Sequence, residues 1–115
     1  MNKRILVVDD EPSIRESLAR HFRHRLFEVE TASDGVDALD KLSRTPFRVV
    51  VSDIIMPRMD GIELLRRIRE ECPMTRTIMI TGYVTLDNAL ACLRLGADTC
   101  VFKPIQNLSE LDEAV

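Results

Sequence analysis

Five polar side chains stand where apolar runs of the sequence end, and their types could support phosphoryl-group chemistry. They are Asp9 and Asp10 after residues 4–8, Asp53 after residues 49–51, Thr81 after residues 77–80, and Lys103 after residues 99–102. Three carboxylates placed together repel one another, and a divalent cation removes that repulsion. Hard oxygen ligands with room for water favour Mg²⁺. One carboxylate could then attack a phosphoryl group, whose charge a lysine and a hydroxyl group would stabilise.

The elements that position these side chains follow from hydrophobic periodicity. Short apolar segments predict five strands, at residues 4–8, 28–32, 49–53, 77–80 and 99–102. Helical spacing of apolar residues follows each one, with helix starts at Pro12, at Ser33 or Asp34, after Gly61, at Thr85, and at Asn107. The second helix is predicted to carry Val36, Leu39 and Leu42. Alternating strands and helices with short connections predict one parallel sheet with helices on both faces, whose carboxyl ends share one edge.

Residues 48–61, R-V-V-V-S-D-I-I-M-P-R-M-D-G, form the centre of this arrangement. An unbroken run of valines is typical of a strand buried on both faces of a parallel sheet. Asp53 ends that strand, and Pro57 with Asp60-Gly61 then indicates a shaped loop. A single acid at a strand end is usually a turn or helix cap. The shared edge of all five polar residues indicates a functional site, but the spacing leaves open which of the three acids would be the nucleophile.

Size and composition restrict the function further. A chain of 115 residues is long enough for one domain, and its net charge of −3 gives no basic surface for nucleic acid or anionic membranes. No apolar run is long enough to span a bilayer. Cys72, Cys92 and Cys100 form no close pair, which fits reduced thiols in a cytoplasmic protein. Because no glycine-rich phosphate loop is present, the sequence favours a module that receives a phosphoryl group over a nucleotide-binding enzyme.

The order of the motifs resembles that of the receiver domains of bacterial two-component response regulators. The segments I-L-V-V-D-D-E, V-V-V-S-D-I-I-M-P-R-M-D-G, I-M-I-T-G, L-G-A-D and V-F-K-P-I carry the resemblance, which spans essentially the whole chain. It implies a flavodoxin-like (βα)5 fold, an open parallel five-stranded sheet of order 2-1-3-4-5 with helices on both faces. Residues 1–115 would then be one receiver domain whose fifth helix is truncated at Val115.

The resemblance also implies a role for each site residue. Asp53 would accept the phosphoryl group, and Thr81 and Lys103 would contact that group after transfer. Asp10, Asp53 and the backbone carbonyl of Ile55 would bind Mg²⁺ directly, with Asp9 acting mainly through water. The domain would be a signalling module and not an enzyme with a separate substrate.

The expected partners follow from the same resemblance. The phosphoryl donor would be the phosphohistidine of a sensor histidine kinase or a histidine phosphotransfer protein. Phosphorylation would switch the surface from the fourth helix to the fifth helix, which would control an output domain C-terminal to this sequence, another partner, or a homodimer. The domain itself would bind neither nucleic acid nor a membrane.

Two positions depart from the family pattern. Cys100 stands where many members have an aromatic switch residue, and Tyr83 or Phe102 could take part of that role. Ile55 and Tyr83 are apolar or bulky where the family tunes access of water, which predicts a long-lived phosphate. Two other functions fit the residues less well: a Mg²⁺-dependent phosphatase, for which the chain has no room for a substrate cap, and an interaction platform that takes no phosphate. His21 and His24 lack a third metal ligand nearby.

Overall fold

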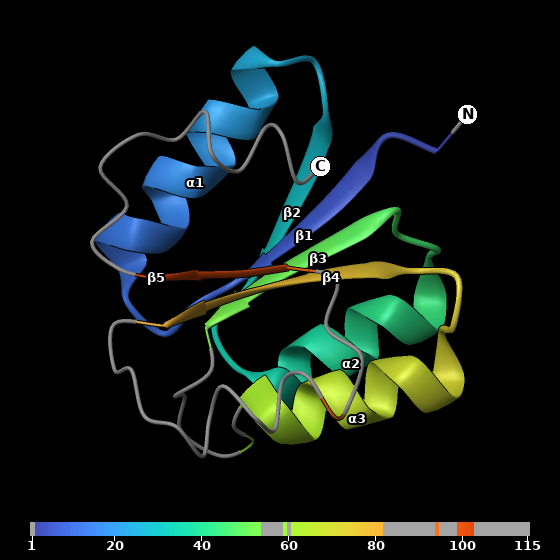
Figure 1. Cartoon of the computed structure of the whole chain (residues 1–115). Helices are drawn as coiled ribbons and strands as arrows, with labels where there is room; N and C mark the ends of the chain where they lie inside the picture. The colour runs from blue at the N-terminus through green and yellow to red at the C-terminus, as the bar shows by residue number, and fades with distance from the viewer. Residues whose placement is uncertain (1, 54–58, 60, 82–93, 95–98, 103–115) are drawn as a thin grey trace.

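A computed structural model describes residues 2–53, 59, 61–81, 94 and 99–102, which form a parallel sheet flanked by helices (Figure 1). No helix among these residues is long and apolar enough to cross a membrane. The elements are β1 (Arg4–Val8), α1 (Pro12–His24), β2 (Glu28–Ala32), α2 (Gly35–Arg44), β3 (Val49–Asp53), α3 (Gly61–Glu71), β4 (Arg76–Thr81) and β5 (Thr99–Phe102).

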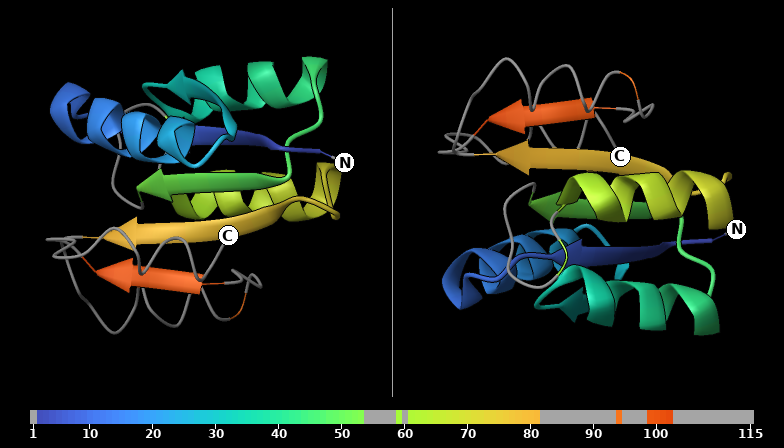
Figure 2. Two further views of the ribbon diagram at one scale, coloured as in Figure 1. Left: turned by 90° about the horizontal axis from the view of Figure 1, so that it is seen from above. Right: turned by 90° about the horizontal axis from the view of Figure 1, so that it is seen from below.

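The strands run parallel in the order β2-β1-β3-β4-β5 (Figure 2). This confirms the predicted α/β class with a parallel sheet and the predicted order of the first four strands. The β5 backbone pairs with β4, with Thr81 opposite Phe102. β4 begins at Arg76, one residue before the predicted start. The predicted fourth and fifth helices lie outside the described residues, apart from the single helical residue Arg94.

Helices cover both faces of the sheet, α1 on one face and α2 with α3 on the other (Figure 1). Successive side chains of a strand point to opposite faces, so a fully buried strand contributes to two separate cores. In β1, Ile5 and Val7 pack with α1, whereas Leu6 and Val8 pack with α2 and α3. Every residue of β3 is buried. The predicted central strand therefore has the environment that its valine run indicated.

The sequence left open whether Ser33 or Asp34 caps the second helix, and the structure of the start of α2 decides this question. Asp34 is the N-cap, and its carboxylate accepts a hydrogen bond from the backbone N–H of Asp37 at 2.9 Å. The helix contains Val36, Leu39 and Leu42 as predicted, but Val36 is 41% exposed and Ala38 is buried. The helix begins at Gly35, so the buried face repeats from that residue at helical spacing and passes through Ala38 and Leu42. Val36 lies on a different side of the helix.

Candidate functional site

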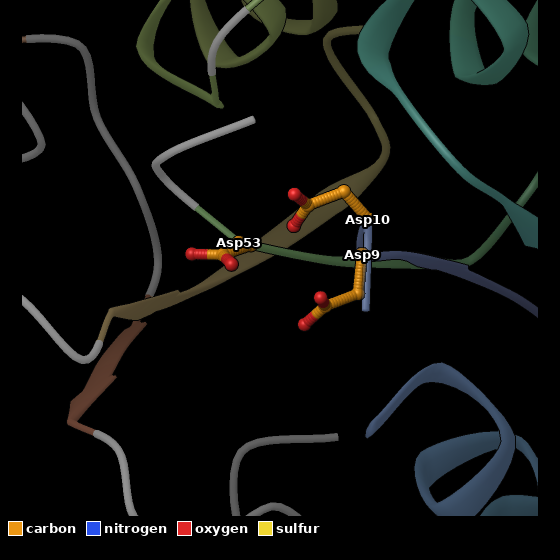
Figure 3. Close-up of side chains that lie close together, drawn as sticks. All are labelled: Asp9, Asp10 and Asp53. Atoms are coloured by element: carbon orange, nitrogen blue, oxygen red, sulfur yellow. The ribbon is translucent and has the colours of Figure 1, made fainter. Parts of the chain in front are cut away.

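The carboxyl ends of β1 and β3 are adjacent, and this brings the three predicted acids together. Val8 pairs with Ser52 in the parallel register, so Asp9 and Asp53 each follow at the same level of neighbouring strands. The carboxylates of Asp9, Asp10 and Asp53 gather at this edge (Figure 3), with ligand oxygens all within 4.8 Å of one another. Asp9 is 1% exposed and Asp53 is 7% exposed, whereas Asp10 is exposed. Two buried acids and one exposed acid thus share one small volume.

Hydrogen bonds fix Asp9 through its backbone and its side chain. Its N–H donates to the carbonyl of Ala32 at 3.2 Å, which continues the β1–β2 pairing. Its Oδ1 accepts from the N–H of Glu11 at 2.9 Å, and its carbonyl oxygen accepts from Nη1 of Arg15 at 2.8 Å. The peptide before Asp9 is therefore held from the neighbouring strand, and the peptide that links Asp9 to Asp10 is held from α1. This defines the direction in which both carboxylates leave the chain.

Arg15 was not identified from the sequence as part of the site. It lies at the start of α1 and is half-buried. Long side chains in a helix lean toward the helix N-terminus, so an arginine in this turn can reach back to the residues that precede the helix. This directional preference, applied to an arginine six positions after Asp9, is the signal that could have found it.

The end of β3 is held by its own neighbours. The buried hydroxyl of Ser52 donates to the carbonyl of Asp53 at 2.9 Å. Farther along, Met59 lies against the start of α2, where a Cβ added to Gly35 would stand 2.9 Å from the Met59 Cβ and 3.0 Å from its carbonyl oxygen. That separation is closer than real side-chain contacts allow, so this approach requires glycine at position 35. Met59 thereby lies in close contact with the start of α2.

The donor set of the acidic cluster fits a hard divalent cation. All three groups are carboxylates, which suit Mg²⁺ or Ca²⁺ better than softer metals. The exposed Asp10 leaves one side open to water, and Mg²⁺ usually keeps several water ligands. The chemistry of these residues thus agrees with the predicted Mg²⁺ site.

The remaining predicted site residues are placed in part. Thr81 ends β4, one residue after Ile80, which pairs with Asp53, so its backbone lies at the same edge. Cys100 lies in β5 opposite Met79. Lys103 is the residue after the last one of β5, and it lies outside the described residues, as do Ile55 and Tyr83. The proximity of Lys103 and of the Ile55 carbonyl to the acids stays a prediction.

Comparison with known sequences gives a family match over almost the whole chain. The family model for the response regulator receiver domain matches residues 5–115. Sensor histidine kinase RcsC of Escherichia coli strain K12 is 41% identical over 101 residues, 88% of this chain and 11% of that protein. Response regulator MprA of Mycobacterium sp. strain KMS is 39% identical over 104 residues, 90% of this chain and 45% of that protein. The chain therefore spans less than half the length of these relatives.

Solved structures show the same fold. A CheY-like receiver domain protein of Methanospirillum hungatei JF-1 superposes with a TM-score of 0.93 at 36% identity, over 98% of this chain and 90% of that one. The regulator TrrA of Thermotoga maritima, solved with Mg²⁺ and BeF, gives 0.86 at 38% identity, over 96% and 94%. A Burkholderia pseudomallei regulator with a phosphorylated aspartic acid and a calcium ion gives 0.91 at 26% identity, over 98% and 66%. With the family match, these similarities show that the chain belongs to the response regulator receiver domains.

Proposed function

We propose that this receiver domain accepts a phosphoryl group on Asp53 in a Mg²⁺-dependent reaction. The observation that carries the proposal is the placement of the Asp9, Asp10 and Asp53 carboxylates within 4.8 Å of one another at the carboxyl edge of the sheet. Neighbouring regulators support it, since one was solved with Mg²⁺ and BeF and another with a phosphorylated aspartic acid. The resemblance of the motifs supports Asp53, among the three acids, as the acceptor.

In the proposed reaction, a carboxylate oxygen of Asp53 attacks the phosphorus atom of a phosphohistidine. The new O–P bond forms as the P–N bond breaks, and the bonding electrons and a proton from solvent go to the departing imidazole. The hydrogen bond from Ser52 to the Asp53 carbonyl helps hold the strand end from which the carboxylate projects. Because positioning accounts for much of phosphoryl-transfer catalysis, a buried and fixed acid at this point is suited to act as the acceptor.

Asp10, Asp53 and the carbonyl of Ile55 would hold the Mg²⁺ ion, with Asp9 acting mainly through water. When bound, the ion would neutralise the crowded carboxylates and the negative charge of the phosphoryl oxygens. The hydrogen bonds from Glu11 and Arg15 to Asp9 keep the acidic turn, Asp9 and Asp10, in place before any ion binds. Partners of this kind orient metal ligands and increase the affinity of a site.

Thr81 and Lys103 would contact the transferred phosphoryl group. A phosphoryl group adds roughly −1.5 to −2 charge and strong acceptor oxygens, so both side chains gain interactions in the phosphorylated state. We infer that these contacts shift an equilibrium of the surface formed by the fourth helix, the fifth strand and the fifth helix of the complete (βα)5 fold. Cys100, at the usual aromatic position, would leave part of this switch to Tyr83 or Phe102.

The relatives place receiver domains in two kinds of longer protein, a sensor kinase and a response regulator. We propose that residues 1–115 act as one receiver domain in the cytoplasm. The domain would take its phosphoryl group from a sensor histidine kinase or a histidine phosphotransfer protein. Its phosphorylated state would control an output domain, another partner or a homodimer. It would be a signalling module that modifies only itself.

The test is the intact mass of the protein after incubation with acetyl phosphate and Mg²⁺. One added phosphoryl group is expected in the wild type and in the matched control Asp40→Asn, whose carboxylate lies on the exposed side of α2. The adduct should be absent from Asp53→Asn and from samples containing EDTA. An adduct that persists in Asp53→Asn would assign the acceptor to another residue. Beryllofluoride mimics the phosphoryl group, so calorimetry with beryllofluoride and Mg²⁺ detects a competent site even where the phosphoprotein is too short-lived to observe. No beryllofluoride binding together with no adduct would overturn the proposal.

A further inference from the structure

The end of the molecule opposite the acidic site carries a hollow that the proposed function does not use. Two adjoining depressions of about 370 and 430 Å³ share Pro46, Phe47, Met74 and Thr75 in their walls. They lie between the segment after α2 and the segment after α3, where β3 and β4 begin. We call this surface, formed by Asn2 and residues 42–48 and 72–76, the amino-edge hollow.

Several apolar side chains of the hollow are exposed to solvent and do not belong to the hydrophobic core. Met74 is 93% exposed, and Pro46 and Pro73 are exposed as well. Phe47, at 3% exposure, closes the hollow from the inside. A methionine side chain adapts its shape readily and is common on surfaces that bind other proteins. The hollow therefore offers an adaptable apolar contact over a rigid aromatic wall.

The two segments that form the hollow are fixed to each other. The buried hydroxyl of Thr75 donates to the carbonyl of Phe47 at 2.9 Å, and the N–H of Arg76 donates to the carbonyl of Arg48 at 3.0 Å. A partner would therefore meet a preformed surface and would not have to order these segments, which lowers the entropic cost of binding.

The charges around the hollow have one sign. Arg44, Arg48 and Arg76 line it, and none of the described residues that line it is acidic, although the chain as a whole has a net charge of −3. Arg44 also pairs with Asp40 at 2.9 Å, so part of its charge is already compensated. Arg48 directly precedes β3 and also has a polar interaction within the chain, whereas Arg76 is the first residue of β4. This distribution complements negative charge placed around an apolar group.

We propose that the amino-edge hollow binds an acidic segment of a partner protein that inserts one apolar side chain beside Met74. Carboxylates on either side of that side chain would pair with Arg48 and Arg76. The hollow and the acidic cluster lie at opposite ends of the strands, so the partner can bind while the phosphoryl site is in use. The surface is therefore a second interaction site, independent of the phosphorylation of Asp53.

The proposal is tested by NMR titration of the whole chain, labelled in the methionine methyl groups and backbone amides. The probe is a short synthetic peptide with a central phenylalanine–leucine pair flanked by glutamates. The expected result is saturable shifts of the Met74 methyl signal and of amides in residues 44–48 and 72–76. Met74→Ser should abolish the amide shifts, and Arg48→Ser or Arg76→Ser should weaken binding about two- to fivefold, the range for exposed ion pairs. Arg20→Ser, on the exposed side of α1, is the matched control and should bind like the wild type.

Three results would overturn the proposal. The first is the absence of shifts in these residues in a wild-type chain whose spectrum shows that it is folded. The second is equal binding of a control peptide in which lysines replace the glutamates. The third is equal binding of a short polyphosphate, which would identify a general polyanion site. Because none of these measurements requires Mg²⁺ or phosphate transfer, their outcome is independent of that of the proposed function.

Discussion

At the scale of single residues, the acidic site depends on groups that bind no ion themselves. Asp9 contributes its carboxylate, yet its carbonyl oxygen accepts a hydrogen bond from Arg15, and its Oδ1 accepts one from the N–H of Glu11. A charged donor gives a stronger hydrogen bond than a neutral one. Arg15 also brings a positive charge to the backbone of the acidic cluster, at the carbonyl oxygen of Asp9. It is therefore suited to hold the acidic turn and to reduce repulsion when no cation is bound.

Replacement of Arg15 by alanine should weaken Mg²⁺ binding. Loss of a hydrogen-bonding partner of a metal ligand typically reduces metal affinity about tenfold to a hundredfold. Removal of a nearby positive charge would act in the opposite direction, but Arg15 is only half-buried and water screens its charge. We expect the loss of positioning to be the larger effect. Isothermal titration calorimetry with Mg²⁺ measures the change.

Arg20→Ala is the control for this experiment, since Arg20 is exposed on the same helix. Calorimetry at two salt concentrations distinguishes positioning from charge, because screening changes only the electrostatic contribution. An affinity of Arg15→Ala equal to or higher than that of the wild type would contradict the assigned role. Failure of the wild type to bind Mg²⁺ would instead count against the metal site as a whole.

Cys72 gives a prediction about pH. Its thiol is partly enclosed, and burial raises the pKa of Cys72, with a smaller contribution from the Glu71 carboxylate. The thiolate is the reactive form, so alkylation by iodoacetamide near neutral pH should be slower than that of a free cysteine. The rate should reach half its maximum above about pH 8.5. The measurement uses a Cys92→Ser, Cys100→Ser variant, so that Cys72 alone reacts.

The same shift has a consequence for stability. A folded-state pKa above the unfolded value means that the folded chain holds the proton more tightly. The stabilising contribution is therefore complete below the ordinary cysteine pKa, and it is lost as pH rises through the raised value. A half-maximal rate at or below about pH 8.5 would contradict this assignment.

At the scale of the elements, the start of α2 supports the acidic edge from outside the site. Asp34 caps the helix through the N–H of Asp37, and the next residue, Gly35, lies against Met59. Met59 belongs to the segment that leads from Asp53 to α3. The cap therefore defines where α2 begins, and with it the position of Gly35, against which Met59 lies.

Substitution of Asp34 by alanine should destabilise the protein by about 1 kcal/mol, the usual effect of losing an N-cap side chain. Urea denaturation followed by circular dichroism gives the free energy of unfolding. Ser33→Ala is the matched control, because Ser33 is adjacent and exposed, and Asp34 is the residue that caps α2. Equal losses in both variants, or none in Asp34→Ala, would show that the cap contributes little.

The elements also show what the sequence could predict. The bounds of β1, β2 and β5 agree with the prediction, since each is a short apolar or β-branched run between turn residues. The exposure of Val36 did not follow from the sequence, because the phase of a short helix depends on its first residue and two capping residues were available.

The candidate site was predictable to a different degree. Parallel strand order alone placed Asp9, Asp10 and Asp53 at one edge, and the structure brings them together. The choice of Asp53 as acceptor came from the family resemblance, since the spacing of the acids does not rank them. Arg15 was missed because a side chain that reaches back to a backbone carbonyl leaves no periodic pattern in the sequence.

At the scale of the whole molecule, the two ends of the sheet differ in charge. The carboxyl ends of β1 and β3 carry three acids, and the amino ends of β3 and β4 carry the arginines of the amino-edge hollow. Crowded acids at one edge place a cost on the folded chain without metal. Binding of a cation to the folded state alone should therefore raise the stability of the entire domain.

We expect the midpoint of thermal unfolding to rise with Mg²⁺ concentration. A ligand present at about a hundred times its dissociation constant stabilises the folded state by about 2.7 kcal/mol. Asp10→Asn should remove this dependence on Mg²⁺ and should also make the metal-free protein more stable, because one of three repelling charges is lost. Scanning calorimetry with Mg²⁺ and with EDTA measures both effects. Asp40→Asn, in which the cluster is intact, should respond to Mg²⁺ as the wild type does, and a midpoint unaffected by Mg²⁺ in the wild type would refute the expectation.

The division of the core by the sheet has a consequence for how this chain can change its sequence. Leu18 and Phe22 pack in one layer with Ile78, and Leu64 and Ile68 pack in the other layer with Val50. A change in side-chain volume affects mainly the neighbours in its own layer. Compensating substitutions in descendants of this chain should therefore pair residues within a layer, and the two halves of the core can evolve, or be redesigned in separate libraries, one at a time.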